Sequence, residues 1–547
     1  MTIDSEAVPQ GEEREEEFDA SLTDEELLKQ ISAWEKESEE YYEVLKRIWA
    51  RNLDYYKGIQ TDVDRIYGKE SKAVENRIWM AVETMIPIAT SRLPDIVVRS
   101  ENEDEQSQMD AQDLQDILGF HMERVGMQEL AERFLRDMAV KRYGVLKAVW
   151  DKDKDDVGVR LVDPRRIRVP KYGKNICELK YIIEDLELSY EQIESEFGKD
   201  KAEELNKTST KDSEMKKRKQ TFSVKEVWTS GYRAFATDTK ILKKEKNPYW
   251  RKSGKNFLEE ARMPYVIKSL FHTEESVIGD TDYIQQTIPI QDNINIIKRR
   301  IENLARKIAN APLLIDSDVM SEEQASAITN EEGIIIYGKD AASGTKIRFE
   351  QPGQIPQYLF QELQLSRQEF DNIWGVHSTT RGERQGRETL GGRKLLRQGD
   401  LGRIDGISRQ FERAMDEVAE LWTQMIMMFY TDEKSFSILG EDGVRFIRKF
   451  KGDKVGNVRL VVKPGSTLPR DEITIHDEAI QLWQQKAIGV RTLYKMLRLP
   501  DVQGAMDDFI DTQSGRILQQ GQSQAGQVMP PGTPTGLPGL SPEGLQQ

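Results

Sequence analysis

Three amphipathic helical patterns follow one another between residues 280 and 430, and they constrain the fold more than any other feature of the chain. In the first pattern, branched apolar residues recur at alternating steps of four and three, at Ile290, Ile294, Ile297, Ile301, Leu304 and Ile308. Residues with this spacing lie on one stripe of an α-helix, and the charged residues between them occupy its other side. The pattern predicts a helix of about twenty residues, roughly 30 Å long, that buries one narrow seam.

The second and third patterns predict two further helices that need packing partners along their whole length. The second pattern has its apolar residues at Leu359, Leu363, Phe370, Ile373 and Trp374. The third has them at Leu401, Ile404, Phe411, Met415, Val418, Trp422, Met425 and Met428. Periodicity alone favours the core of an ordinary helical domain for all three patterns.

A compact insert, residues 311–356, separates the first two patterns and has mixed helical and strand character. Ser321 and Gln324 form a capping-box pair, which predicts the start of a short helix. The β-branched run Ile334–Ile336 and the alternating segment Lys346–Phe349 predict strands. The insert is therefore expected to be a small α/β unit.

A basic, glycine-rich segment, residues 378–392, separates the second and third patterns and contains one large apolar residue, Leu390. Such a composition cannot form a packed core. Between residues 378 and 403 the seven basic and three acidic residues give a local charge of 7 − 3 = +4, within a chain of net charge −16. The basic residues are Arg381, Arg384, Arg387, Arg393, Lys394, Arg397 and Arg403. From composition alone, a flexible surface turn and a contact for an anionic partner are equally good interpretations.

The order of these segments resembles that of the portal proteins of tailed bacteriophages. The segment Ile288–Asn295, which leads into a helix that ends at Ala311-Pro312, resembles the entry to the portal stem. Nearer the N-terminus, four short motifs are similar to the start of the portal wing. They are Arg51-Asn52, Tyr55–Gln60, Asn76-Arg77 and Leu93-Pro94. The resemblance covers roughly residues 40–510, and the order and spacing of the motifs make it more specific than any one of them.

The resemblance implies an α+β, predominantly helical portal fold that assembles as a ring. Its regions, in chain order, would be a disordered acidic N-terminus (1–20), a wing of helices and mixed β-sheet (21–279), a first stem helix (280–310), a clip (311–356), a second stem helix (357–377), a tunnel loop (378–392), a long wing helix (393–430), a wing β segment (431–470), a helical crown (471–512) and a disordered Gln/Gly/Pro-rich tail (513–547). The acidic composition at the start of the chain and the Gln, Gly and Pro content at its end independently predict disorder there.

The resemblance also implies a role, partners and site residues. Twelve copies would form a ring at one capsid vertex, a channel for packaging and ejection of double-stranded DNA without regard to its sequence. The ring would bind the large terminase, then the head-tail adaptor, together with the major capsid and scaffolding proteins. The tunnel-loop residues facing DNA would be Arg381, Arg384, Arg387, Arg393 and Lys394. The clip surface would include Glu322, Glu323, Glu331 and Glu332. Stem packing and the subunit interface would use Ile290, Ile294, Ile297, Ile301, Leu304, Ile308, Leu363, Phe370 and Trp374.

Other segments give local predictions. Thr23 with Glu26 is a capping box that opens a helix to about Tyr56. Alternating segments between residues 145 and 272 predict a half-buried sheet, including a hairpin at Ser230-Gly231. The polar stretch 199–220 is expected to be a solvated excursion rather than a nucleic-acid contact, and residues 471–497 are expected to be helical.

Composition and motifs argue against several classes of protein. With 547 residues the chain needs more than one core, and 32 % charged residues with one cysteine indicate a soluble protein made in a reducing compartment. It has no run of about 18 apolar residues, and its acidic N-terminus is unlike a signal peptide, so assembly in the host cytoplasm is expected before incorporation into the virion.

The sequence also gives no indication of catalysis or of a cofactor or metal. Gly333–Lys339 resembles a phosphate-binding loop but is followed by Asp340, where Ser or Thr is needed for Mg²⁺. The four histidines lack metal-ligand spacing. A nuclease or motor subunit of the packaging machinery is therefore disfavoured. A coiled-coil scaffold is disfavoured because Pro312 and Gly391-Gly392 interrupt the helical pattern.

Overall fold

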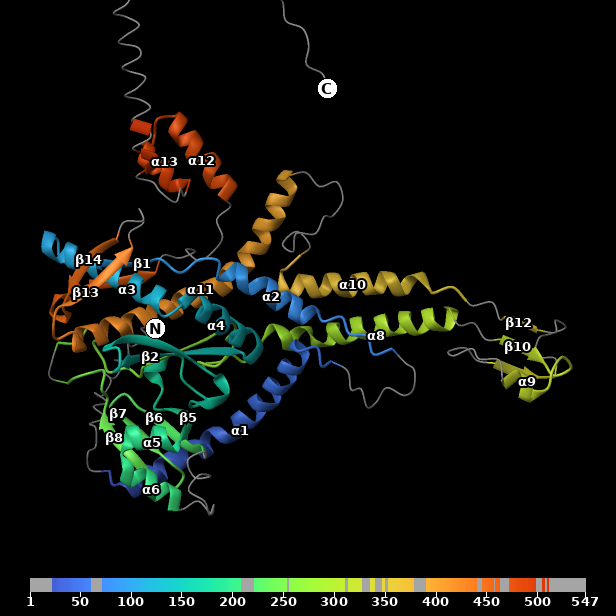
Figure 1. The fold of residues 1–547 in the computed structure, drawn as a ribbon, viewed down its shortest axis with the longest axis horizontal. Helices are drawn as coiled ribbons and strands as arrows, with labels where there is room; N and C mark the ends of the chain where they lie inside the picture. The colour runs from blue at the N-terminus through green and yellow to red at the C-terminus, as the bar shows by residue number, and fades with distance from the viewer. Residues whose placement is uncertain are drawn as a thin grey trace, which may run out of the picture. The chain divides into compact units, whose positions relative to one another are not determined.

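The computed structural model describes residues 22–60, 71–207, 221–252, 255–309, 313–326, 335–339, 347–349, 353–377, 390–439, 445–456, 458–462, 472–497, 504–506 and 509–510. The predicted disordered ends, 1–20 and 513–547, lie outside these residues. The chain divides into two compact units, Met1–Phe436 with Arg448–Pro469 and Ser437–Ile447 with Arg470–Gln547. Helices and strands are mixed within the first unit (Figure 1), which confirms the α+β class.

Helix α1, Asp24–Tyr56, begins and ends where the sequence predicts. The Thr23 hydroxyl accepts a hydrogen bond from the Glu26 N–H, and the Glu26 carboxylate accepts one from the Thr23 N–H at 2.8 Å. This reciprocal pair is the predicted capping box. Along the helix the buried apolar side chains are Leu27, Ile31, Tyr42, Leu45 and Trp49.

The remaining helices of the N-terminal half are α2, Arg77–Ala89, α3, Glu105–Arg124, and α4, Met127–Lys141. Helix α3 begins at Glu105 because the Asp104 carboxylate caps it by accepting the Ser107 N–H at 2.9 Å. Between α2 and α3, strand β1, Ile96–Ser100, pairs antiparallel with β15, Val458–Val462. This pairing ties the N-terminal part of the chain to a segment beyond the third helical pattern.

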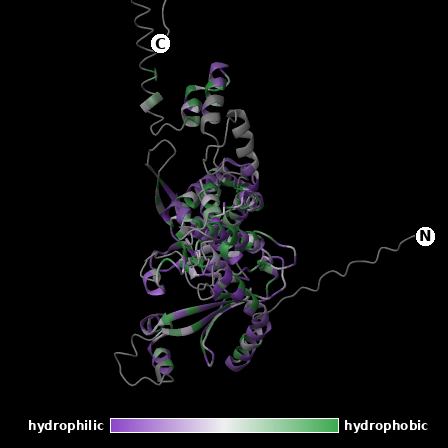
Figure 2. Cartoon of the chain, turned by 90° about the vertical axis from the view of Figure 1, so that its right-hand side faces the viewer, coloured by the Kyte–Doolittle hydropathy of each residue, from purple (hydrophilic) through white to green (hydrophobic). Residues whose placement is uncertain are grey.

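Two antiparallel sheets lie side by side in sequence within the first unit, between residues 143 and 269. The three-stranded sheet has the order β3 (Asp156–Val162), β2 (Tyr143–Asp151), β9 (Tyr265–Ser269). The five-stranded sheet has the order β4 (Ile167–Arg168), β5 (Ile182–Ser189), β6 (Thr221–Trp228), β7 (Tyr232–Ala236), β8 (Ile241–Lys246). The predicted hairpin at Ser230-Gly231 is the β6–β7 pair. Hydrophilic and hydrophobic residues alternate along these strands (Figure 2), as expected for sheets with distinct faces.

The five-stranded sheet is covered on both faces. On one face the first turns of α1 pack on it, with Leu27 and Ile31 against Val227. On the other face lie α5, Tyr190–Phe197, and α6, Lys199–Lys207. The expectation of a solvated excursion from residue 199 was therefore wrong for residues 199–207. They form a helix because Ala202, fully buried, contributes to the core under the sheet.

A buried charge network joins the two sheets. Lys147 of β2 places its ammonium 2.7 Å from Glu184 of β5 and 2.6 Å from Glu226 of β6. Glu226 also accepts hydrogen bonds from the Trp228 indole and from Arg233 at 2.9 Å. Burial raises the pKa of Glu226, but the charges of Lys147 and Arg233 outweigh burial and hold that pKa below its usual value. The carboxylate is therefore ionised and depends on its cations.

Helix α11, Leu390–Phe429, is the third predicted pattern and carries the largest set of fully buried side chains in any one helix, among them Phe411, Met415, Val418, Trp422 and Met425. It begins at Leu390, so the predicted loop 378–392 is wrong at its last three residues, which are helical.

The first two patterns form α8, Tyr283–Ala309, and α10, Gln357–Trp374. Between them, the insert folds as β10 (Leu313–Asp316), α9 (Glu322–Ser326), β11 (Ile335–Gly338) and β12 (Ile347–Phe349), with β10 at the centre of a three-stranded sheet. The Gln324 N–H donates to the Ser321 hydroxyl and the Ser321 N–H to the Gln324 amide oxygen, which confirms the capping pair. Both predicted strands are present.

The last elements are strands β13, Lys434–Leu439, and β14, Arg445–Phe450, and helices α12, Glu472–Gln484, and α13, Val490–Met496. One continuous helix over residues 471–497 was expected, but Lys486 adopts a left-handed backbone conformation with φ of 59°. This conformation cannot continue a right-handed helix, so the segment forms two helices. Short 3₁₀ turns occur at Pro164–Arg166, Ile176–Glu178 and Gly452–Lys454.

His121 of α3 lies fully buried beside the last residues of α11. Its Nε2 is 3.1 Å from the Tyr430 hydroxyl, which in turn hydrogen-bonds to Asp156. The Nδ1 atom is buried and has no hydrogen-bond partner among the described residues. Burial lowers the pKa of His121 to about 4, although the Asp156 carboxylate opposes the shift. The imidazole is therefore neutral in the folded protein at neutral pH.

Replacing Lys147 by Met should destabilise the first unit by about 3–5 kcal/mol, because two buried carboxylates lose the ammonium that they share and only Arg233 remains paired with Glu226. Lys154→Met, on an exposed turn, is the matched control and should change stability by less than about 0.5 kcal/mol. Thermal and chemical unfolding followed by circular dichroism measures both. Equal melting temperatures for the two variants would contradict the network's role.

The His121 imidazole should make the protein less stable as pH falls from about 6.5 to about 4. Its folded pKa of about 4 lies below the unfolded value of 6.5, so protons bind the unfolded chain first in this window. Between pH 7 and pH 5 the loss is about 2 kcal/mol. His121→Gln cannot titrate and should show a smaller fall in melting temperature over the same interval. An equal fall in both proteins would refute this assignment.

Candidate functional site

Helices α8 and α10 lie side by side and run in opposite directions (Figure 1), and the α/β insert follows one and precedes the other. At one end, Tyr283 stacks on Trp374 with ring centroids 4.8 Å apart, and the Trp374 indole N–H donates to the Thr287 hydroxyl at 3.4 Å. Further along, the Asn293 side chain donates to the Ser366 hydroxyl at 3.0 Å. The contacts pair the start of α8 with the end of α10, as an antiparallel arrangement requires.

The predicted stem residues fall into two groups by burial. Those that are buried are Ile294, Ile297, Leu363, Phe370 and Trp374. Those that are half-buried are Ile290, Ile301, Leu304 and Ile308. All nine lie on the two paired helices, and their role at a subunit interface stays a prediction. The buried group packs within the chain, so its loss would first weaken the chain itself.

A row of buried polar residues on α8 was not predicted from the sequence. Thr287, Gln291 and Asn295 are fully buried, although they stand beside the apolar stripe and were assigned to no site. Their spacing of four residues places them on one helical face. Polar residues repeating at this step next to an apolar stripe were the available signal, since buried amides need hydrogen-bond partners.

These amides hold an extended segment, residues 71–77, against the helix pair. The Glu75 N–H donates to the Asn295 amide oxygen at 2.9 Å, and the Gln291 amide donates to the Glu75 carbonyl at 2.7 Å. The Arg77 N–H donates to the Gln291 amide oxygen at 3.1 Å. At its other end, the Ser71 N–H donates to Asn303 at 2.7 Å. We call residues 71–77 the strap.

The Glu75 carboxylate lies between cations from three elements. Arg367 of α10 binds both of its oxygens, at 2.8 and 2.6 Å, and Lys298 of α8 lies 3.5 Å away. Arg77 of α2 is 3.4 Å from Glu75 and 2.5 Å from Asp371 of α10. A bidentate arginine–carboxylate pair fixes geometry as well as contributing energy. The strap, α8 and α10 are thus joined at one carboxylate.

The electrostatic balance at Glu75 favours the ionised form. Partial burial raises its pKa, but the hydrogen bonds and charge of Arg367, with the charges of Lys298 and Arg77, hold the pKa of Glu75 below its usual value. A carboxyl group whose folded pKa is lowered stabilises the fold above its unfolded pKa. That contribution is lost as pH falls through the lower, folded value.

Contacts join the end of α10 to α11, on either side of residues 378–389, which lie outside the described residues. Gly375 ends α10 in a left-handed conformation with φ of 67°, and a side chain there would meet Arg403, which donates to the carbonyls of Asn372 and Ile373. His377 Nδ1 is 2.6 Å from the Asp400 carboxylate of α11, and its Nε2 is 3.1 Å from the Asn372 amide oxygen. The end of α10 and the N-terminal part of α11 are therefore held together.

Most of the residues predicted to face DNA or protein partners lie outside the described residues or close to the ends of described segments. Arg381, Arg384 and Arg387 lie outside the described residues, while Arg393 and Lys394 lie in the first turns of α11. On the insert, Glu322 and Glu323 are exposed on α9, and Glu331 and Glu332 lie outside the described residues. Their roles toward DNA and protein partners stay predictions.

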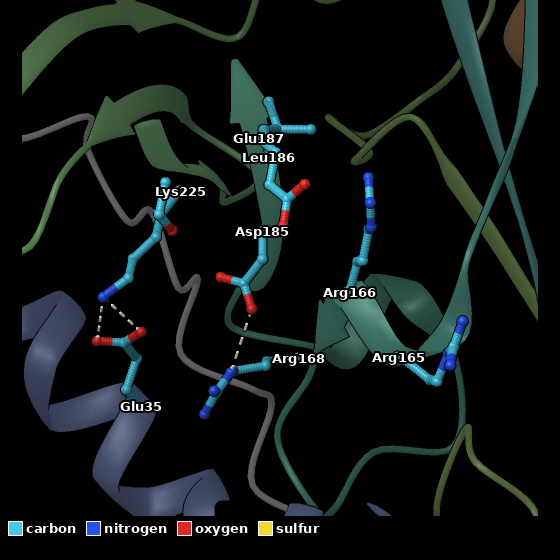
Figure 3. A pocket seen from close by; sticks show the side chains of 9 residues that line it. Glu35, Arg165, Arg166, Arg168, Asp185, Leu186, Glu187 and Lys225 are labelled. Atoms are coloured by element: carbon cyan, nitrogen blue, oxygen red, sulfur yellow. Dashed lines mark hydrogen bonds and ion pairs between the residues drawn. The ribbon is translucent and has the colours of Figure 1, made fainter. Parts of the chain in front are cut away.

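A polar pocket of about 290 Å³ lies beside the five-stranded sheet (Figure 3). Lys225 forms an ion pair with Glu35 at 2.7 Å. Arg168 pairs with Glu39 at 2.7 Å and lies 3.7 Å from Asp185. Lys225 and Arg168 are thus already paired and offer little free charge to an anionic ligand.

Two searches of the described residues bear on other kinds of site. No group of three or more His, Cys, Asp or Glu side chains there could hold a metal ion. None of the described helices is both long enough and apolar enough to cross a membrane.

Comparison with known proteins gives one match. A family model described as "Phage P22-like portal protein" matches residues 32–457, well over half of the chain, including α8, the insert, α10 and α11. No curated protein matches the chain.

Glu75→Gln should destabilise the protein by about 2 kcal/mol at neutral pH, because three cations lose their shared carboxylate. Glu123→Gln, exposed near the end of α3, is a matched control and should have little effect. The difference between the two variants should shrink as pH falls below the usual glutamate pKa of about 4.3, where wild-type Glu75 begins to lose its own contribution. Melting curves at several pH values measure this, and a Glu75→Gln variant as stable as the control would contradict it.

Proposed function

Because the chain belongs to the phage P22-like portal protein family, we propose that twelve copies form a ring at one capsid vertex and that the genome is packaged and ejected through its channel. The family has a structural, non-enzymatic role in the virion, at a capsid vertex, where it interacts with phage packaging components. The proposal goes beyond family membership in three respects: the ring, the number of copies in it and the passage of DNA through it.

The paired helices α8 and α10 are the observation that carries the proposal. We assign them to the stem, the insert 311–356 to the clip, and residues 378–392, helical from Leu390, to the tunnel loop. The wing would comprise residues 21–279, 393–430 and 431–470, and the crown residues 471–512. In support, the insert follows one end of the helix pair, and at the other end the contact between His377 and Asp400 joins the end of α10 to α11. A DNA channel that also binds partner proteins needs such an arrangement, with the insert available to partners and the basic segment available to DNA.

Charge distribution supports a conduit that does not bind DNA strongly. The chain has a net charge of −16, so a ring of copies repels DNA from most of its surface. Arginines in the tunnel loop would contact phosphates, and these contacts do not depend on base sequence. The energy for movement would come from the large terminase, which would bind the clip before the head-tail adaptor replaces it.

The first test is the assembly state. End-on class averages of the purified wild-type protein by electron microscopy should show closed rings, and native mass spectrometry should give a mass of twelve chains. A monomer or an open filament at high concentration would contradict the proposal.

Replacing Arg381, Arg384 and Arg387 together by Ala should leave rings intact and reduce DNA packaging or retention in filled heads, because phosphate contacts are lost while the packed helices are unchanged. The matched control replaces the same three residues by Lys. It keeps the charge and should retain most of the wild-type efficiency. Packaging and release assays at low and high salt measure both. Wild-type packaging and retention by the alanine variant at every salt concentration would refute a DNA contact for these arginines.

A further inference from the structure

The three-stranded sheet of the insert has two open edges. Its order is β11–β10–β12, so the central strand is paired on both sides, while β11 and β12 each pair on one side only among the described residues. An edge strand presents a row of backbone N–H and C=O groups that another strand can pair with, and many proteins block it with charges or proline. Neither edge strand here contains proline, and β11 has no charged residue. Both edges can therefore accept a further strand.

The core under this sheet is small. Among the described residues it consists of buried Leu313 and Ile315, with Met320, Ile335 and Tyr337 packed against them. The insert, residues 311–356, is close to the length below which a unit needs disulfides, metals or oligomerisation for stability. The single cysteine of the chain lies outside the insert, and no group of described residues could hold a metal ion. Contact with another chain is the remaining source of support.

Ile347 of β12 is an apolar residue that lacks cover on the core side of the sheet. It lies level with Ile315 of β10, and Ile315 lies level with Tyr337 of β11, so the three side chains point to the same face. Ile315 is fully buried and Tyr337 packs against it, but Ile347 is 41 % exposed. Helix α9 packs against β11. The exposed isoleucine thus lies at the edge of the sheet opposite the one on which α9 packs.

The two edges suit each other in strand direction. Strand β11 runs parallel to β10 and β12 runs antiparallel to it, so β11 and β12 run in opposite directions. A second insert placed beside the first in the same orientation therefore brings its β11 to β12 of the first as an antiparallel pair. Antiparallel pairing is the commoner and slightly more stable kind. The added strand also brings its own α9 to the edge where Ile347 is exposed.

We propose that the β12 edge of one insert pairs with the β11 edge of the insert in the next copy, so that the inserts form one continuous sheet around the ring. This inference rests on the proposed ring and names one contact within it. The contact joins two different edges, so it is head-to-tail, the kind that generates a closed ring when the rotation closes. Rotation about the ring axis keeps every residue at its own height. With the strands along that axis, Ile347 of one copy lies level with Tyr337 of the next, and Arg348 lies level with Ile336.

A strand from a different protein is the other occupant that these edges could have. Such a strand would satisfy one edge of each insert and leave the other open. A second copy satisfies both, because every interface uses one edge of each kind. Once the ring closes, no edge of the described sheet stays open, as in a closed barrel. A second copy of the chain is therefore the better fit.

The test is disulfide cross-linking of the full-length chain with Cys177→Ser, which removes its only cysteine. One variant adds Tyr337→Cys with Ile347→Cys, and another adds Ile336→Cys with Arg348→Cys. Within one chain the central strand separates each pair by about 9.5 Å, too far for a disulfide. Between copies the proposed pairing brings the Cα atoms to about 4.5 or 5.5 Å, and these two spacings alternate along the strands. After oxidation of assembled rings, we expect a ladder of covalent oligomers on a non-reducing gel, strongest for the pair at the shorter spacing.

Two kinds of control accompany these variants. Each single-cysteine variant should stay monomeric on the gel, because a head-to-tail contact does not place a residue beside its own copy. The matched control pair, Ile336→Cys with Ile347→Cys, lies on the same two edges. These two residues differ by one position in height and point to opposite faces of the sheet, so no ladder is expected. Electron microscopy before oxidation shows whether each variant assembles.

Hydrogen exchange on the wild-type ring needs no substitution and replaces the cross-linking if the cysteine variants do not assemble. In an open edge strand, alternate backbone N–H groups point to solvent and exchange fast. In the continuous sheet these groups are hydrogen-bonded as well. Peptides that cover residues 335–338 and 347–349 should therefore show slow exchange at all of their strand amides.

The possible outcomes separate the pairing from the proposed function. Rings with no ladder from either pair, an equal ladder from the control pair, or covalent dimers from a single-cysteine variant would overturn the pairing and leave the proposed function standing. Fast exchange of half of the strand amides in wild-type rings would do the same and leave the edges free for a strand of another protein. Wild-type protein that forms no ring would overturn the proposed function and the pairing with it.

Discussion

Buried polar side chains need partners, and in this protein that constraint fixes the geometry of the two helices on which the rest is arranged. Gln291 and Asn295 of α8 bind the backbone of the strap, and Glu75 of the strap binds Arg367 of α10. Each of these contacts satisfies a group whose burial would otherwise cost free energy. Since the hydrogen bonds are directional, they fix the position of the strap along the helix pair more narrowly than apolar packing would.

The same constraint recurs where the two sheets meet. Lys147, Glu184 and Glu226 come from three strands in two sheets, and the ammonium lies within 2.7 Å of both carboxylates. Such a cluster is a poor source of net stability compared with an apolar core. It does oppose sliding of one sheet past the other, because any displacement would leave a buried charge unpaired.

The strap also gives the helix pair two unlike flanks. One is closed by Glu75 and Arg77, and the other presents Arg300 on α8 and Glu369 on α10. The contacts of the strap thus leave the two flanks of the helix pair chemically different.

The sequence by itself determined the order and type of most elements: the three long helices, the capped starts at Thr23 and Ser321, the β6–β7 hairpin and the α/β insert. These depend on local periodicity and capping, which neighbouring residues specify. It also pointed to the family, through the order of its motifs. What it did not give were features that depend on residues far apart in the chain. The burial of Gln291 is decided by the strap, more than two hundred residues away in sequence, and the helix at 199–207 by the sheet it covers. Likewise, the stripe Ile294–Ile297 was visible in the sequence, but only the tertiary structure showed that it is buried within one chain, because burial depends on which distant part of the chain packs against the stripe.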